Sequence, residues 1–155
     1  MPSTLKSLLR APLGALLLLL PLLCPAAGID PGAAVDAFHK ALHDKQADAA
    51  LGLLAADVSI YQQGFQLGRE QYKSDPLQAD IAFAGVTSYE VLDRKILWLG
   101  DNAACVTTRS RSRGTFSGEA VDLINTETMV LRRAGDGWIV VHIHWSAHPA
   151  DQGGP

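Results

Sequence analysis

Cysteine is scarce in this sequence of 155 residues, where only Cys24 and Cys105 occur. Cys24 lies in an N-terminal segment that we expect to be removed, so Cys105 has no partner for an intrachain disulfide. We therefore expect the fold to be stabilised by its core alone, and Cys105 to behave as a small buried residue of a strand.

The sequence also has no excess of basic residues and lacks the short motifs of several enzyme classes. Its 13 Lys and Arg residues stand against 16 Asp and Glu residues. No basic field is present to recruit nucleic acid, and we expect no nucleic-acid partner. No nucleophile motif, phosphate-binding loop or cysteine metal cluster is found, and we expect no cofactor. Repeats and long linkers are missing too, which predicts a single domain over residues 30–148, with 149–155 as a disordered tail.

The first 27 residues have the order of a secretory signal peptide. Lys6 and Arg10 precede an apolar run over 11–23, which small residues follow. This run is shorter than the ~20 residues that span a bilayer. We expect cleavage near Ala26 to Gly28 and a periplasmic or secreted product with a net charge of −5, no longer attached to the membrane. The alternatives are a retained anchor or core helix, and lipidation at Cys24, which the bulky Leu23 disfavours.

The first half of the remaining chain predicts helices. Val35, Phe38 and Leu42 recur at helical spacing after a candidate cap at Asp30. A second helix is expected over 46–55, a brief strand over 58–61, and a third helix over 68–83, which Pro76 must kink or split.

After Gly85 the apolar period changes to two, which predicts four long strands over 87–99, 103–113, 120–133 and 138–146. The turns between them are short, so neighbouring strands are antiparallel. Helices followed by a four-strand meander predict an α+β fold, with the N-terminal helices packed on a strongly curved, mainly antiparallel sheet.

The last two strands resemble a known superfamily. The stretch 125–133, "NTETMVLRR", and the stretch 138–146, "WIVVHIHWS", carry the likeness. They are similar to the nuclear-transport-factor-two-like superfamily, also called the SnoaL-like or cystatin-like cone fold. The likeness is to the branch with the association domain of calcium/calmodulin-dependent kinase and small exported bacterial proteins. The resemblance implies a cone-shaped fold, a homodimer, and a pocket between the helices and the sheet.

Departures from the family pattern limit what the resemblance implies. Two arginines that line a pocket for small acids in the kinase domain are replaced by Met129 and Trp145, which we still expect at the pocket. Asp75 and Pro76 replace a pair of histidines that many bacterial relatives carry. Steroid isomerases of the superfamily need a tyrosine where this chain has Phe38 and His39, so we do not expect that activity.

His142 and His144 lie two residues apart in the last strand. Strict alternation puts Trp138, Val140, His142, His144 and Ser146 on one face of that strand, and Ile143 with Trp145 on the other. A metal site, hydrogen bonds within the fold or dimer, and a direct pocket role all remain open for the two histidines. We expect no metal, because further ligands are not evident. A single bulge would exchange the two faces.

Arg109, Arg111 and Arg113 alternate along one predicted strand. Such a row either faces water, balanced by acids such as Asp122 on the next strand, or places Arg109 in the pocket as an anion clamp, paired with Glu127.

Tyr61 and Tyr72 combine an apolar ring with a polar tip, which suits a pocket wall as well as a core.

The leading interpretation is an exported, dimeric domain that binds a small polar or anionic organic molecule. The first alternative is a cyclase, dehydratase or isomerase-type enzyme with His144 as acid or base. The second is a homo-oligomeric assembly module.

Overall fold

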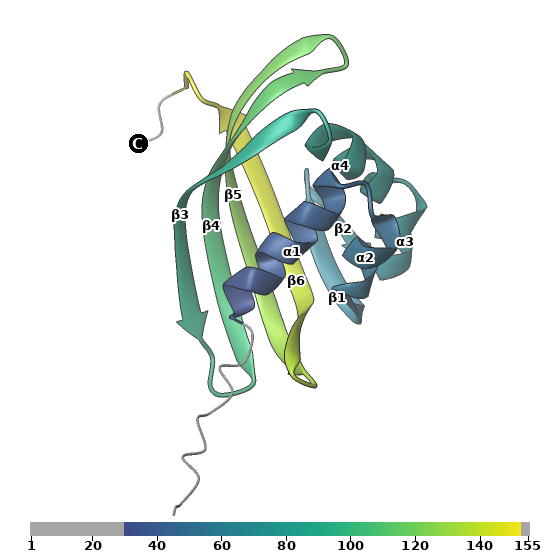
Figure 1. Ribbon diagram of the computed structural model, residues 1–155, viewed down its shortest axis with the longest axis vertical. Helices are drawn as coiled ribbons and strands as arrows, with labels where there is room; N and C mark the ends of the chain where they lie inside the picture. The colour runs from purple at the N-terminus through teal and green to yellow at the C-terminus, as the bar shows by residue number, and fades with distance from the viewer. Residues whose placement is uncertain (1–29, 153–155) are drawn as a thin grey trace, which may run out of the picture.

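The computed structural model describes residues 30–152, and the predicted signal peptide, its cleavage site and Cys24 lie outside this range. Within residues 30–152, four helices and six strands follow one another (Figure 1). They are α1 (Pro31–His43), α2 (Ala47–Gly52), β1 (Leu54–Gln62), β2 (Phe65–Gly68), α3 (Arg69–Ser74), α4 (Pro76–Ala84), β3 (Thr87–Trp98), β4 (Ala103–Phe116), β5 (Glu119–Ala134) and β6 (Gly137–Pro149).

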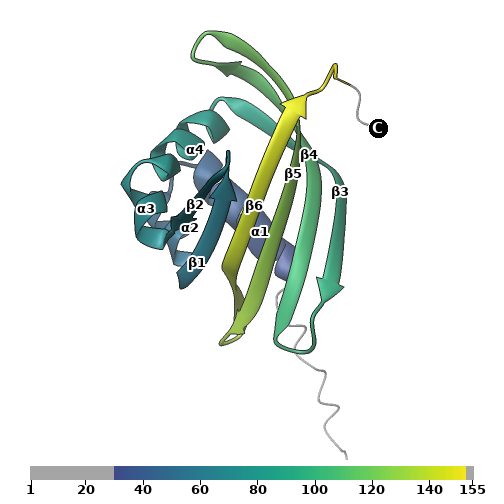
Figure 2. The same ribbon diagram turned by 180° about the vertical axis from the view of Figure 1, so that it is seen from behind.

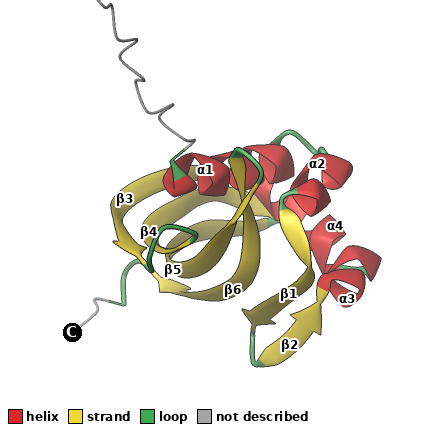
Figure 3. Ribbon diagram, turned by 90° about the horizontal axis from the view of Figure 1, so that it is seen from below, coloured by secondary structure: helices red, strands yellow, loops and turns green. Residues whose placement is uncertain are grey.

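The strands form one sheet in the order β2-β1-β6-β5-β4-β3. All neighbouring strands are antiparallel except β1 and β6, which run parallel. The sheet curls under α1, and the other helices lie at the same side (Figure 3). This confirms the predicted α+β fold of N-terminal helices on a strongly curved, mainly antiparallel sheet.

Local signals in the sequence explain where the helices begin and end. The Asp30 side chain accepts a hydrogen bond from the backbone N–H of Gly32, so it caps α1 as predicted. Pro76 begins α4 and separates it from α3, because proline cannot donate the backbone hydrogen bond that a continuous helix requires.

The segment around the first hairpin differs from the prediction. β1 begins at Leu54, so the second helix is shorter than expected and the strand longer. β2 is an additional strand that pairs with β1 across a turn at Gln63 and Gly64, both at positive φ. Such a two-residue turn matches the twist of a hairpin, and Gly64 adopts this conformation without strain.

The core lies between α1 and the concave face of the sheet. Phe38 and Val35 from the helix are fully buried, as are Ile60, Met129 and Ile143 from the strands. Each such side chain contributes roughly 1.5–3 kcal/mol on burial. Cys105 is only half-buried on β4, so the expectation of a buried cysteine is wrong.

The convex face of the sheet has no covering helix in the described part of the chain (Figure 2). Successive side chains of β4 point to opposite faces of the sheet. Ser110 and Ser112 are therefore buried on the concave face, whereas Arg109 and Arg113 are exposed on the convex face. Arg111 donates two hydrogen bonds of 2.6 Å to Asp122 on β5. This confirms the water-facing alternative for the arginine row.

Candidate functional site

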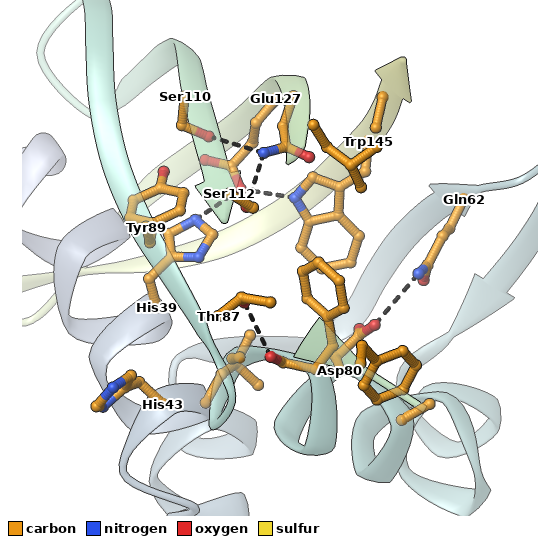
Figure 4. Close-up of a pocket in the computed structure, with 18 of the residues that line it drawn as sticks. His39, His43, Gln62, Asp80, Thr87, Tyr89, Ser110, Ser112, Glu127 and Trp145 are labelled. Atoms are coloured by element: carbon orange, nitrogen blue, oxygen red, sulfur yellow. Dashed lines mark hydrogen bonds and ion pairs between the residues drawn. The ribbon is translucent and has the colours of Figure 1, made fainter. Parts of the chain in front are cut away.

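A cavity of about 400 Å³ opens between the helices and the concave face of the sheet (Figure 4). Its walls come from α1, the end of β1, α4 and the four strands β3 to β6. Apolar side chains make up much of the lining, and a small set of polar groups lies among them. The polar and titratable lining residues are His39, His43, Gln62, Gln63, Asp80, Thr87, Tyr89, Ser110, Ser112, Asn125, Glu127, Trp145 and Ser146.

Glu127 on β5 is the most enclosed carboxyl group of the cavity, with a side chain only 4% exposed. One of its oxygens, Oε2, accepts hydrogen bonds from the indole Nε1 of Trp145 at 2.6 Å and from Nε2 of His39 at 2.8 Å. The other oxygen, Oε1, is buried and has no hydrogen-bond partner among the described residues. A buried carboxylate oxygen without a partner is costly, and it is therefore a site where a ligand can donate a hydrogen bond or a proton.

His39 reaches Glu127 from α1 and is held between aromatic rings. Its imidazole stacks on Tyr89 with 4.3 Å between ring centroids, and it meets the edge of Phe38 at 5.9 Å. Partial burial raises the pKa of Tyr89 to about 12, and the nearby carboxylate of Glu127 contributes. The Tyr89 hydroxyl therefore keeps its proton at neutral pH and remains a hydrogen-bond donor.

Asp80 forms a second acidic group on the helix side of the cavity. Its carboxylate accepts hydrogen bonds from the hydroxyl of Tyr72 at 2.8 Å and from Nε2 of Gln62 at 3.3 Å. Burial raises the pKa of Asp80, while the Tyr72 and Gln62 hydrogen bonds and the nearby His39 act in the opposite direction. The carbonyl oxygen of Gln62, Oε1, is buried and has no partner in the described part of the chain.

Three small polar side chains lie on the sheet beside Glu127. Nδ2 of Asn125 donates to Oγ of Ser112 at 2.9 Å and to Oγ of Ser110 at 3.4 Å. Each serine oxygen thus accepts from the amide, and Ser112 keeps its own O–H for donation to a ligand oxygen.

A bulge in β6 decides which residues of the last strand face the cavity. Val130 pairs with His142 and Leu131 with Val140, so Val141 is an extra residue in β6. The alternation of side chains shifts at this point. As a result Val140 and Ile143 share the buried concave face, and the prediction that strict alternation holds from Trp138 to Ser146 is wrong.

His142 and His144 lie on the convex face, opposite the cavity. Oγ of Ser59 and Nδ1 of His142 are 3.0 Å apart, and the ring of Tyr61 lies 5.5 Å from His142 and 6.4 Å from His144. Burial lowers the pKa of His142, and the neighbouring His144 adds to this effect. Tyr61 and His144 instead border a second hollow near the ends of β1 and β6.

The structure brings together only part of the site that the sequence predicts. Glu127 and Trp145 line the cavity, and Tyr72 supports it through Asp80. Met129 is fully buried in the core, and Arg109 is exposed on the convex face, so neither lines the cavity.

Sequence reasoning missed His39, Asp80, Tyr89 and Gln62. These residues come from four separate elements, and their side chains meet only through tertiary packing. His39 carried one usable signal, because it sits beside the core residue Phe38 at the helix position that the family comparison singled out.

The described residues contain neither a metal-binding cluster nor a membrane-spanning helix. Within residues 30–152 there is no group of three or more His, Cys, Asp or Glu side chains that could hold a metal ion. No helix in that same range combines the length and the apolar character needed to cross a membrane.

Comparison with known sequences gives one family. The sequence model of the SnoaL-like domain matches residues 32–151. No curated protein sequence matches the chain.

Solved structures with the same architecture are numerous, and three of them illustrate the range. A ketosteroid isomerase-like protein from Shewanella frigidimarina is 30% identical, with a TM-score of 0.70 over 74% of this chain and 93% of its own. A protein from Xanthomonas campestris similar to the calcium/calmodulin-dependent protein kinase II association domain is 19% identical, with a TM-score of 0.67 over 77% and 86%. A scytalone dehydratase-like protein from Novosphingobium aromaticivorans is 16% identical, with a TM-score of 0.64 over 76% and 81%.

Proposed function

Because the chain belongs to the SnoaL-like domain family, we propose that its cavity binds a small organic molecule and moves a proton on it, with Glu127 as the base. The observation that carries this proposal is the arrangement of the Glu127 carboxylate. Two N–H groups hold one of its oxygens, and the other oxygen is buried without a partner among the described residues. A fixed carboxylate in a mainly apolar cavity suits general base catalysis.

The proposed reaction begins with removal of a proton from a carbon next to a carbonyl group. Oε1 of Glu127 accepts this proton, and the electron pair of the broken C–H bond moves into an enolate. The developing negative charge on the carbonyl oxygen is stabilised by hydrogen bonds from the hydroxyls of Ser112 and Tyr89. Glu127 then delivers the proton to a different carbon of a conjugated enolate, which gives an isomerisation, or to a hydroxyl group on the β-carbon, which leaves as water and gives a dehydration.

Two further observations support an acid–base role. Burial raises the pKa of Asp80 in the same cavity, which favours its protonated form and therefore suits it as a proton donor. The ketosteroid isomerase-like relative is 30% identical to this chain, which favours proton transfer over binding alone. We therefore propose that the His39–Glu127 pair has the acid–base role that the sequence analysis suggested for His144.

Solvent deuterium exchange tests the proposal. 2-Tetralone is a neutral two-ring ketone whose α-hydrogens exchange slowly without a catalyst. In D₂O the protein should accelerate this exchange, because the proton on Glu127 is replaced by deuterium before it returns to carbon. Glu127→Gln should lower the rate by a factor of roughly 10² or more. NMR of the ketone measures the loss of α-hydrogen signal.

A matched control separates this site from the convex face. His144→Gln should leave the exchange rate unchanged, because His144 does not line the cavity. If the exchange rate falls in His144→Gln but is unchanged in Glu127→Gln, the reaction takes place on the convex face and not in the cavity. If 2-tetralone binds but the protein does not accelerate exchange of its α-hydrogens, the proposal of catalysis is wrong and only a binding function remains.

We also propose that the chain is exported and forms a homodimer through the convex face of the sheet. The basic and apolar N-terminal segment supports export. Leu97 and Tyr61 are 62% and 39% exposed on this face, and Val130, which pairs with Cys105 and His142, is half-buried on it. Kinase association-domain structures among the relatives support oligomerisation. Light scattering should give a dimer for residues 30–155 and a monomer for Val130→Glu, with Lys73→Glu on α3 as the control.

A further inference from the structure

The cavity carries two unpaired acceptors, and together they restrict what it can bind. Among the described residues, only two buried side-chain polar atoms lack a hydrogen-bond partner. They are Oε1 of Glu127 and Oε1 of Gln62, and both residues line this cavity. Both atoms accept hydrogen bonds and cannot donate them. The missing partners are therefore donors in both places.

The two acceptors lie in different parts of the cavity. Glu127 lies beside Ser110 and Ser112 on the sheet, whereas Gln62 lies beside Asp80 toward the helices (Figure 4). Gln62 donates its amide N–H to Asp80, which fixes its carbonyl as the free end. A single ligand that satisfies both acceptors has its two polar ends separated by an apolar body.

The charge of the cavity lining also restricts the ligand, because it disfavours an anion. Two acidic residues, Asp80 and Glu127, line the cavity, and none of its described lining residues is Lys or Arg. Arg94 lies near Tyr89, but it pairs with Asp36 at 2.7 Å and is not a lining residue. A carboxylate or phosphate ligand would meet like charge without a guanidinium or ammonium partner.

We infer that Gln62 and Asp80 form a second ligand subsite, which binds a hydroxyl or amine donor at the far end of a neutral or cationic ligand. This inference rests on the proposed function, in which the other end of the ligand presents a removable proton to Glu127. It also departs from the anionic ligand that the arginine row in the sequence suggested. Arg109, which the sequence analysis considered as an anion clamp, lies on the convex face of the sheet.

A set of substituted 2-tetralones tests the subsite. The parent ketone has no donor at its far ring, the 6- and 7-hydroxy compounds add one, the 6- and 7-methoxy compounds keep the oxygen without its hydrogen, and the 6- and 7-carboxy compounds carry a negative charge. Binding is followed by ¹⁵N NMR of the three tryptophan indoles. Trp145 lines the cavity, whereas Trp98 and Trp138 contact each other outside its lining.

One hydroxy compound should bind about tenfold more tightly than its methoxy counterpart and than the parent, and the carboxy compounds should bind most weakly. Gln62→Met has a similar length but no carbonyl acceptor. It should remove the difference in affinity between the hydroxy compound and its methoxy counterpart.

The outcomes separate the two proposals. If parent, hydroxy and methoxy compounds bind equally, or if a carboxy compound binds best, the subsite is overturned and the cavity remains a binding site. If Gln62→Met keeps the full hydroxyl preference, the donor is bound elsewhere and the assignment to Gln62 is wrong. If no tetralone moves the Trp145 indole signal, both the subsite and the proposed function fail.

Discussion

The substitution Trp145→Phe tests the central hydrogen bond of the cavity. It removes the indole N–H that donates to Glu127 at 2.6 Å, and it keeps an aromatic side chain where the Trp145 ring now stacks on Phe38 with 6.2 Å between ring centroids. The Glu127 side chain is 4% exposed, so water cannot easily replace the lost donor. A hydrogen bond to a charged group contributes about 1.5–3 kcal/mol. We therefore expect the free energy of unfolding to fall by about 2 kcal/mol.

Urea unfolding measures this change. The midpoint should fall while the slope of unfolding free energy against urea stays the same, because the surface exposed on unfolding is nearly unchanged. Trp98→Phe is the matched control, since Trp98 is 54% exposed and should lose less than about 1 kcal/mol. The double mutant with Glu127→Gln should show a coupling energy of roughly 1 kcal/mol or more. A loss in Trp145→Phe no larger than in Trp98→Phe would refute the reasoning.

Two further substitutions test the surroundings of the site. Because burial raises the pKa of Asp80, its contribution to stability is fully present below the ordinary value of about 3.9 and is lost as pH rises through the raised folded value. Asp80→Asn should therefore flatten the decline of stability above pH 4 in thermal unfolding, and an unchanged pH profile would contradict the raised pKa. Gly114→Ala should cost at least about 2 kcal/mol, because its Cβ would lie 2.3 Å from the backbone carbonyl of Val86. Gly52→Ala, which meets no atom within 4 Å, should be neutral or stabilising by up to about 1 kcal/mol, and equal effects at both glycines would contradict the close approach of β3 and β4.

Much of the fold could be predicted because the signals are local. The change from helical to alternating periodicity after Gly85 marks the boundary between the helices and the meander. Asp30 and Pro76 act on their own helix ends, so their effects depend little on the rest of the chain. The short strand β2 was missed because its four residues lie at the edge of the sheet and bury little apolar surface.

The site could be predicted only in part, because it depends on one bulge and on long-range contacts. Alternation along β6 gives the pattern of its side chains, but the extra residue Val141 reverses which of them face the cavity. His39 and Glu127 are 88 residues apart in the chain, and nothing in either local stretch indicates that they meet. The sequence therefore drew attention to His142 and His144, which are close neighbours in the strand but face away from the cavity.

A crystal structure of the protein with 6- or 7-hydroxy-2-tetralone is the most direct test of the account. We predict that the α-carbon of the ketone lies beside the carboxylate of Glu127, with the hydroxyl group hydrogen-bonded at Gln62 and Asp80. A ligand bound on the convex face beside His144 would contradict the proposed function. A ligand in the cavity with its carbonyl end turned away from Glu127 would contradict the role of Glu127 as the base.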